Sequence, residues 1–430
     1  MVCSKILSAA LFIRLPVSRT ATLLAALLLG WPLLLPAADI PLSLSEALAI
    51  AVRDSSLLAA QRAGVAAAEE TTVSARELPD PKLKLGIDNL PLDGADKYSL
   101  TRDFMTMRRI GVAQEFPRAE KREIRGRRAE HQLAREQAML GDTRAALRRD
   151  VAVAWTERYY AEQMAKIVEE QYAESVLQRD ALQAGVAAGR TTLTERIALD
   201  TTLQMLLNRR AEFDKQAARA QAMLARWLGE AARRPLLPLS PADAATGAAD
   251  IHTPYHPHLQ TLQRQIDIAQ TEADLAKAAT KPDWGMELSY AQRGSAYSNM
   301  LTVQVSIDLP LFADKRQNRE TAARAAQVEQ ARALREDARR LHLAEAAAAQ
   351  IEWDAASVRL KRFDDALLPL ARDNVTVALA AYRGGLSSLA AVLEARRMEI
   401  DLRLQKLQLA AEQGRARAQL IYFVPEESAK

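Results

Sequence analysis

Apolar and polar residues alternate along four short stretches of a chain whose remaining pattern is typical of long helices. The clearest stretch is Leu301 to Pro310, in which the odd-numbered residues up to Leu309 are apolar and the even-numbered residues up to Asp308 are polar. A period of two predicts a β-strand with one apolar and one polar face. Residues 82–88, 110–116 and 284–290 alternate in the same way, although Gln114 interrupts the apolar row of its stretch.

Strands of about nine to eleven residues have the length that crosses a bilayer as tilted barrel strands. Four strands are too few to close a barrel. We therefore expect several copies of the chain to contribute strands to one barrel, which predicts an oligomer.

Two very long helices are predicted beside these strands. The chain has no proline between Pro117 and Pro235, and residues 118–184 predict a helix of about 67 residues, or about 100 Å. Residues 313–381 predict a second one, which Pro369 should kink. Apolar residues recur at spacings near three and four along both, and alanine is frequent, as close helix packing requires.

Shorter helices are expected after the glycine-rich turns that end the long ones, at about 190–229 and 386–421. Between the two halves, residues 230–256 are rich in proline and predict an irregular connector.

The order of these elements indicates an internal duplication. Four pairs of landmarks lie 203, 193, 194 and 196 residues apart: Pro79-Asp80-Pro81 with Pro282-Asp283-Trp284, Phe116-Pro117 with Leu309-Pro310, Lys121-Arg122 with Lys315-Arg316, and Gly189 with Gly385. Several landmarks that keep their order and spacing predict two structural repeats, about 39–229 and 257–421.

The first 38 residues predict a secretory signal peptide. Lys5, Arg14 and Arg19 precede an apolar run over 21–35, which ends in small residues at Ala37-Ala38. A membrane anchor is the alternative, and the shortness of the run disfavours it. The only cysteine, Cys3, lies in this segment, so the mature chain is expected to lack thiols and disulfides.

Charge and hydropathy narrow the class of protein further. Without residues 1–38, which hold three basic and no acidic residues, 55 basic residues face 54 acidic ones. This balance gives no reason to expect nucleic-acid binding. No apolar run of membrane-helix length follows residue 38, so a membrane crossing would use strands.

Motifs of catalysis and metal binding are missing from the sequence. We find no glycine-rich phosphate loop, nucleophile elbow or paired metal-histidine motif, and predict neither an enzyme nor a cofactor. His252, His256 and His258 in the connector are interpreted as incidental loop residues. Met105 and Met107 have soft donor atoms, but on one strand face we interpret them as lipid-facing or packing residues.

One stretch resembles a known family signature. The sequence from Tyr382 to Ala395 is similar to the Tyr-x-x-Gly-x-x-Ser/Thr-x-x-Asp-x-Leu-x-Ala pattern of the TolC family of trimeric outer-membrane efflux ducts, with Ala391 in place of the usual Asp. Residues 42–48 resemble the family's helix-start motif. The layout agrees over essentially the whole mature chain.

This resemblance implies a mainly α fold with a small β part. Long antiparallel helical hairpins would form an α-barrel through the periplasm, and four strands per protomer would form a twelve-stranded β-barrel in a homotrimer within outer-membrane lipid. It also implies a periplasmic membrane-fusion adaptor and an inner-membrane RND pump as partners. Residues 88–94 and 103–112 resemble the heavy-metal branch, which exports cobalt, zinc and cadmium or copper and silver ions.

The resemblance also implies roles for individual residues. The periplasmic entrance would be lined by Glu195, Glu394, Arg190 and Tyr382, with the two glutamates setting cation preference. The adaptor would dock on the tips at Gly185, Gly189, Gly384, Gly385 and Ser388. Trp284 and Tyr290 would lie at the two membrane interfaces. Ordinary exposed glutamates and helix-ending glycines are the plainer interpretation of these positions.

Two other functions stay open from the sequence. The same duct could serve drug efflux or type I protein secretion. A soluble periplasmic helical adaptor or scaffold would explain the helices, but it explains neither the signal segment nor the one-sided strands.

Overall fold

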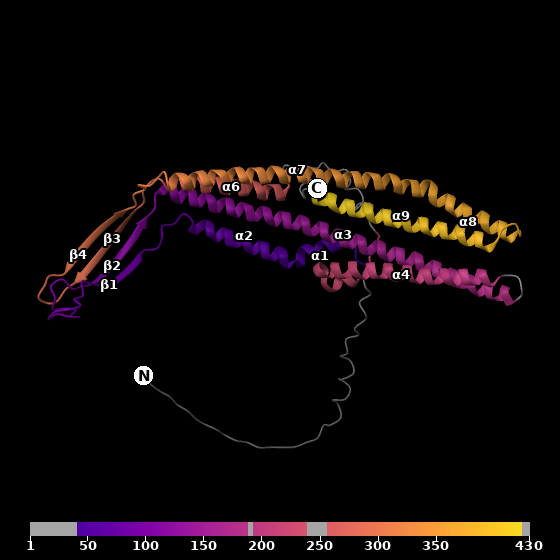
Figure 1. Ribbon diagram of the computed structural model, residues 1–430, viewed down its shortest axis with the longest axis horizontal. Coiled ribbons are helices and arrows are strands. Elements are labelled where there is room, and N and C mark those ends of the chain that lie inside the picture. Colours follow the sequence, from indigo (N-terminus) through magenta and orange to yellow (C-terminus); the bar gives the residue numbers. More distant parts are fainter. Residues whose placement is uncertain (1–40, 188–191, 239–255, 424–430) are drawn as a thin grey trace, which may run out of the picture. The chain divides into compact units, whose positions relative to one another are not determined.

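The computed structural model describes residues 41–187, 192–238 and 256–423, and their helices and strands belong to one unit, Leu42–Lys430. The predicted signal segment, 1–38, lies outside the described residues, as do Gly189, Arg190 and His252. Figure 1 shows a sheet that is joined to a set of long helices.

All four predicted strands are present and form one antiparallel sheet in the order β1-β2-β3-β4. They are β1 (Lys82–Asp88), β2 (Met107–Phe116), β3 (Trp284–Gln292) and β4 (Met300–Ile307). With 7 and 8 residues, β1 and β4 are shorter than expected. Pro81 cannot donate a ladder hydrogen bond before β1, and Asn89 turns the chain after it at φ 54°.

The helices follow the predicted plan. They are α1 (Leu44–Asp54), α2 (Ser56–Ser74), α3 (Ala119–Ala187), α4 (Leu193–Leu228), α6 (Pro257–Ala278), α7 (Gln317–Arg362), α8 (Leu368–Arg383) and α9 (Leu389–Phe423). The predicted long helix over 118–184 is confirmed as the 69-residue α3.

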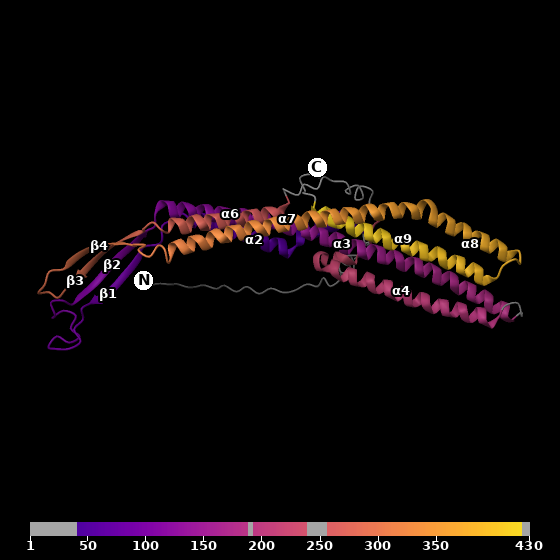
Figure 2. The ribbon, with the colours of Figure 1, turned by 45° about the horizontal axis from the view of Figure 1, so that its top comes forward.

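Helix α3 begins directly after β2 and organises the helical part, since it packs against α1, α2, α4, α6 and α9. Two antiparallel hairpins, α3 with α4 and α8 with α9, end on the side away from the sheet (Figures 1 and 2). In both halves of the chain, a helix therefore leads into a strand pair, and the strand pair leads into a helical hairpin.

The predicted break near Pro369 is confirmed. Helix α7 passes into a five-residue π-helical segment, η4 (Phe363–Leu367), before α8 begins. Because Pro369 has no N–H, the backbone beside it cannot keep the regular ladder. The Leu368 N–H donates instead to the Phe363 carbonyl, five residues earlier.

The largest core cluster lies where α1 and the start of the connector cover the middle of α3. Trp155 on α3 is fully buried there and stacks on Tyr159 at 5.2 Å between ring centroids. The connector begins as the 3₁₀ helix η1 (Gly229–Arg233), and Leu42 then forms a parallel bridge with Leu236.

Buried Arg158 fastens this connector to α3. Its guanidinium donates to the carbonyls of Ala232 and Arg234, the latter at 3.0 Å, and to the Glu162 carboxylate at 2.7 Å. The irregular connector thus has a fixed start on α3, and the sequence analysis did not identify Arg158 as the residue that holds it.

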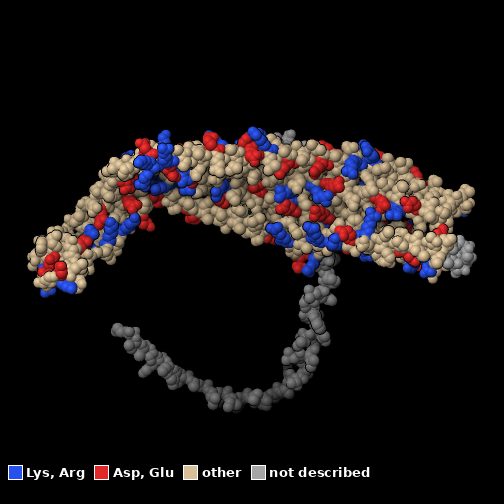
Figure 3. Space-filling view, in the orientation of Figure 1, with Lys and Arg blue, Asp and Glu red and all other residues tan. Residues whose placement is uncertain are grey.

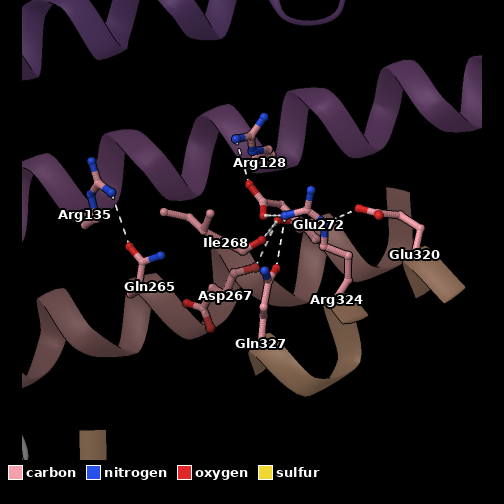
Figure 4. A network of polar contacts seen from close by, with 10 residues as sticks. Arg128, Arg135, Gln265, Asp267, Ile268, Glu272, Glu320, Arg324 and Gln327 are labelled. Atoms are coloured by element: carbon pink, nitrogen blue, oxygen red, sulfur yellow. Dashed lines mark hydrogen bonds and ion pairs between the residues drawn. The ribbon is translucent and has the colours of Figure 1, made fainter. Parts of the chain in front are cut away.

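An ionic network joins three helices closer to the sheet (Figure 4). Glu272 on α6 accepts from Arg128 on α3 at 2.7 Å and from Arg324 on α7 at 3.0 Å. Arg324 also pairs with Glu320 at 2.8 Å on its own helix. One carboxylate therefore ties α6 to both long helices.

Candidate functional site

One face of the sheet is apolar and exposed along all four strands. The register places Leu85 beside Ile110, Ile110 beside Tyr290, and Tyr290 beside Leu301. The apolar residues on this face that are exposed are Leu83, Leu85, Ile87, Ile110, Val112, Trp284, Met286, Leu288, Tyr290, Leu301, Val303, Val305 and Ile307. Exposed apolar residues that form a continuous surface across four strands mark a contact with a membrane or with another protein.

The opposite face carries charged and small residues that pair across the strands. Lys84 on β1 lies 2.5 Å from Glu287 on β3, and Arg109 on β2 lies 3.2 Å from Asp88 on β1. The alternation therefore separates an apolar side from a hydrated side, which a strand at a lipid–water boundary requires.

Trp284 and Tyr290 lie on the apolar face, as expected. Trp284 begins β3 beside the helices and stacks on Phe116 at 4.3 Å, with an interplanar angle of 17°. Tyr290 lies six residues further along the strand, about 20 Å away at the usual rise. Met105 lies before β2 begins, so the expectation that Met105 and Met107 share one strand face is wrong.

The tip of the α8–α9 hairpin has a defined glycine cap. The Gly385 N–H donates to the Tyr382 carbonyl at 3.0 Å, and the Leu386 N–H to the Ala381 carbonyl at 2.8 Å. Gly385 has φ +70°, a conformation that favours glycine, whereas Gly384 at φ −80° does not need one.

Leu386 leaves this cap 87% exposed, and no large hydrophobic residue in the described chain is more exposed. Ser388 begins the next helix by accepting the Ala391 N–H at 3.4 Å. Tyr382 lies in the last turn of α8 and is exposed.

At the other tip, Gly185 lies in the last turn of α3, and α4 begins after Thr192. Glu195 closes a capping box: its carboxylate accepts the Thr192 N–H at 3.0 Å, and the Thr192 hydroxyl accepts the Glu195 N–H at 3.3 Å. The Thr-x-x-Glu pattern signals this cap in the sequence, but our sequence analysis did not identify it.

Glu394 is exposed on the second turn of α9 and borders a cavity of about 240 Å³ between α3, α4 and α9. Arg397 and Asp401 line the same cavity, and Asp401 pairs with Arg209 on α4 at 2.7 Å. Nearby, Arg396 pairs with Glu174 on α3. These charges join the two hairpins and were not singled out from the sequence.

His256 and His258 are not incidental loop residues, which corrects the sequence interpretation. His256 is fully buried as the N-cap of α6, and its Nε2 lies 2.8 Å from the Tyr422 carbonyl oxygen. His258 lies 3.1 Å from Asp142, whose carboxylate also accepts the Tyr422 hydroxyl at 2.9 Å. The ring of buried His342 lies against that of His256, with 4.2 Å between the ring centroids and the ring planes tilted by 53°.

This cluster shifts the pKa values of its members in opposite directions. The hydrogen bond that His258 makes to the Asp142 carboxylate raises the pKa of His258. Burial lowers the pKa of His256, and burial together with the neighbouring histidines lowers that of His342 to about 4. Within the described residues, no group of histidine, cysteine or acidic side chains has the geometry of a metal site.

Charged residues are interspersed along the helices on the face seen in Figure 3. Within residues 41–187, 192–238 and 256–423, no helix combines the length and the apolar character of a membrane span.

Comparisons with known proteins give two findings. Residues 255–423 match the family described as "Outer membrane efflux protein". No curated protein matches the sequence.

Solved structures share the fold over most of the chain. One is CusC, with 15% identity, a TM-score of 0.75, and coverage of 88% of this chain and 90% of that one. Another is the outer membrane protein VceC from Vibrio cholerae, with 16% identity, a TM-score of 0.74, and coverage of 88% and 95%. A third is the open state of the MtrE outer membrane channel from Neisseria gonorrhoeae, with 14% identity, a TM-score of 0.69, and coverage of 88% of both chains.

The mainly helical fold with one small sheet is thus confirmed. The family match supports the outer membrane as the location of the chain and a channel rather than an enzyme. The TM-scores lie close together, so they do not select one branch of such channels.

Proposed function

We propose that this chain belongs to the outer membrane efflux protein family and is the exit duct of a tripartite efflux system. The observation that carries the proposal is the one-sided sheet at the end of two long helices. The apolar face meets lipid, the ion-paired face lines a water-filled lumen, and the helices continue the passage into the periplasm.

The dimensions of the sheet support this proposal. Strands of 7 to 10 residues are about 23–34 Å long at about 3.3–3.4 Å per residue, and the longest reaches the length of about nine to eleven residues with which a tilted strand crosses a bilayer. In the described chain, β1 and β4 each have a neighbour on one side only. Three copies would pair these edges and close a twelve-stranded barrel, which removes every exposed edge.

A pair of neighbouring substitutions tests the membrane contact. Val303→Asp places a charge on the apolar face, at a cost below the about 2–4 kcal/mol that a lysine or an arginine has near the bilayer centre, and Thr302→Asp is the matched control on the polar face. We expect membrane fractions and planar bilayers to retain conducting protein for the wild type and Thr302→Asp only. Wild-type protein in the soluble periplasmic fraction would instead indicate a helical scaffold.

The tips are proposed to dock a periplasmic adaptor, which an inner-membrane RND pump would accompany. Exposed Leu386 at the glycine cap is the strongest apolar contact available there. Leu386→Asp should abolish co-purification of the adaptor. Leu370→Asp, at a residue of α8 that is 64% exposed and lies further from the turn, should leave it intact. Equal adaptor binding by both variants would place the docking surface elsewhere.

For the cargo we propose heavy-metal cations, with three copies of Glu394 and of Glu195 attracting them at the entrance. Channels with both glutamates changed to alanine should lose cation preference in single-channel recordings, and unchanged selectivity would refute this role. Metal tolerance of a deletion strain tests the cargo itself. If the deletion strain becomes sensitive to a drug and a dye but keeps its metal tolerance, the proposed duct stands and the proposed metal cargo is refuted.

A further inference from the structure

The junction between the sheet and the helices contains a partly buried ion pair that links the two halves of the chain. Lys121, near the start of α3, is 6% exposed, and its Nζ donates to Asp283 at 2.8 Å and to the Lys281 carbonyl at 2.8 Å. The other carboxylate oxygen of Asp283 accepts the Arg118 N–H at 3.0 Å. Asp283 lies directly before β3, so the pair fixes the second strand pair against the first long helix.

Both residues have counterparts in the internal duplication. The counterpart of Asp283 is Asp80, which lies 203 positions earlier and just before β1. The counterpart of Lys121 is Lys315, which lies 194 positions later and just before α7. Asp80 and Lys315 are exposed, and the side chain of neither has a hydrogen bond or an ion pair in the described chain. The first long helix and the second strand pair therefore make this ion pair within the chain. The corresponding residues of the other repeat, Asp80 and Lys315, do not pair within the described chain.

The strand register shows that the two repeats superimpose residue by residue. Lys82 pairs with Ala113 in the first strand pair, and the corresponding Gly285 pairs with Ser306 in the second. The two strand pairs meet where β2 pairs with β3; we call this contact the seam. Because the repeat relates β2 to β4 and β3 to β1, the corresponding seam joins β4 of one copy to β1 of the next.

This predicted seam keeps the faces of the sheet in order. Transferring the β2–β3 register places Val305 opposite the partner subunit's Leu85, and both belong to the apolar face. Within the chain, Gly111 faces Ser289 so closely that an added Cβ would lie 2.7 Å from the serine Cβ. The corresponding pair across the seam is Gln304 with the partner subunit's Gly86, which again has glycine on one side.

We propose that Lys315 of one copy pairs with the partner subunit's Asp80 and so repeats the Lys121–Asp283 contact at every subunit boundary. The proposal rests on the trimeric duct proposed above and identifies the contact that sets the register between its copies. Asp314 is less suited to pair with Lys315, since its carboxylate already accepts the Asn318 amide at 2.9 Å.

Crosslinking of the full chain in detergent tests the proximity. Asp80→Cys with Lys315→Cys, treated with a short bismaleimide, should give covalent dimers and trimers, and each single variant should give monomers. The matched control pairs Asp80→Cys with Arg332→Cys, an exposed position further along α7, and should also give monomers. Failure of the first pair to crosslink within a conducting trimer would overturn the proposal but not the duct.

Charge reversal tests the energetics. Asp80→Lys and Lys315→Asp should each lower the temperature at which the trimer dissociates, and the double variant should restore it. Absence of rescue refutes the pairing. If only Lys315→Asp has an effect, and the effect depends on anionic lipid, the lysine binds lipid phosphate instead. A monomeric wild-type protein in detergent and lipid would refute the trimer itself.

Discussion

Replacing Arg158 by methionine should loosen the connector while it preserves the packing of α3. Methionine keeps most of the aliphatic volume but leaves the Ala232 and Arg234 carbonyls without their donor. Each carbonyl left without its donor costs about 1–3 kcal/mol, so the two carbonyls together cost about 2–6 kcal/mol. Unfolding entropy is about 2.1 cal/mol/K per residue, or about 0.8 kcal/mol/K for the unit Leu42–Lys430. The melting temperature should therefore fall by about 3–7 °C.

Thermal unfolding in detergent, followed by circular dichroism, measures this shift. The matched control is Arg233→Met in the same connector, because the Arg233 side chain is 73% exposed and its ion pair in the described chain is with exposed Glu230. This variant should melt within about 1 °C of wild type. Hydrogen exchange of η1 should accelerate in the Arg158 variant alone. If both variants melt like wild type, the buried guanidinium does not hold the connector.

Three further changes test other parts of the structure. Glu272→Gln removes the carboxylate shared by α3 and α7 and should lower the melting temperature by about 1–2 °C; the difference should shrink in high salt, and an exposed Glu329→Gln control should show none. The lowered pKa of His342 means that the unfolded chain takes up the proton first, so stability is complete above pH about 6.5 and falls as the pH drops towards about 4. His342→Leu should flatten that part of the stability curve, and parallel curves would contradict the assignment. Gly385→Ala should destabilise the α8–α9 turn by about 1 kcal/mol and speed its hydrogen exchange, whereas Gly384→Ala should not.

The elements that the sequence predicts well are those with local physical causes. The alternation from Leu301 to Leu309 depends only on side-chain direction in a strand. Because no proline lies between Pro117 and Pro235, nothing interrupts the helix after Pro117 for many turns. Pro369 likewise predicts a break in the second long helix. It does not predict that the break takes the form of a π-helical segment.

The features that sequence analysis missed depend on distant partners. His256 looks like a loop residue because Tyr422, which covers it, lies 166 positions away. Arg158 resembles any other charged residue of a long helix until the connector folds back over it. A pattern of neighbours cannot reveal such burial, because the groups that remove water from these side chains come from other elements.

The two tips differ in how freely their acids can act. The Glu195 carboxylate is held by the Thr192 N–H and hydroxyl, so turning it towards a cation would break the cap of α4. Glu394 is exposed and borders a cavity that Arg397 also lines. Both acids would add to the negative potential of an entrance. Of the two acids, only Glu394 can take up a new partner without loss of a helix cap, so in the proposed duct a gate built on ion pairs of these acids would use the α9 side of the entrance.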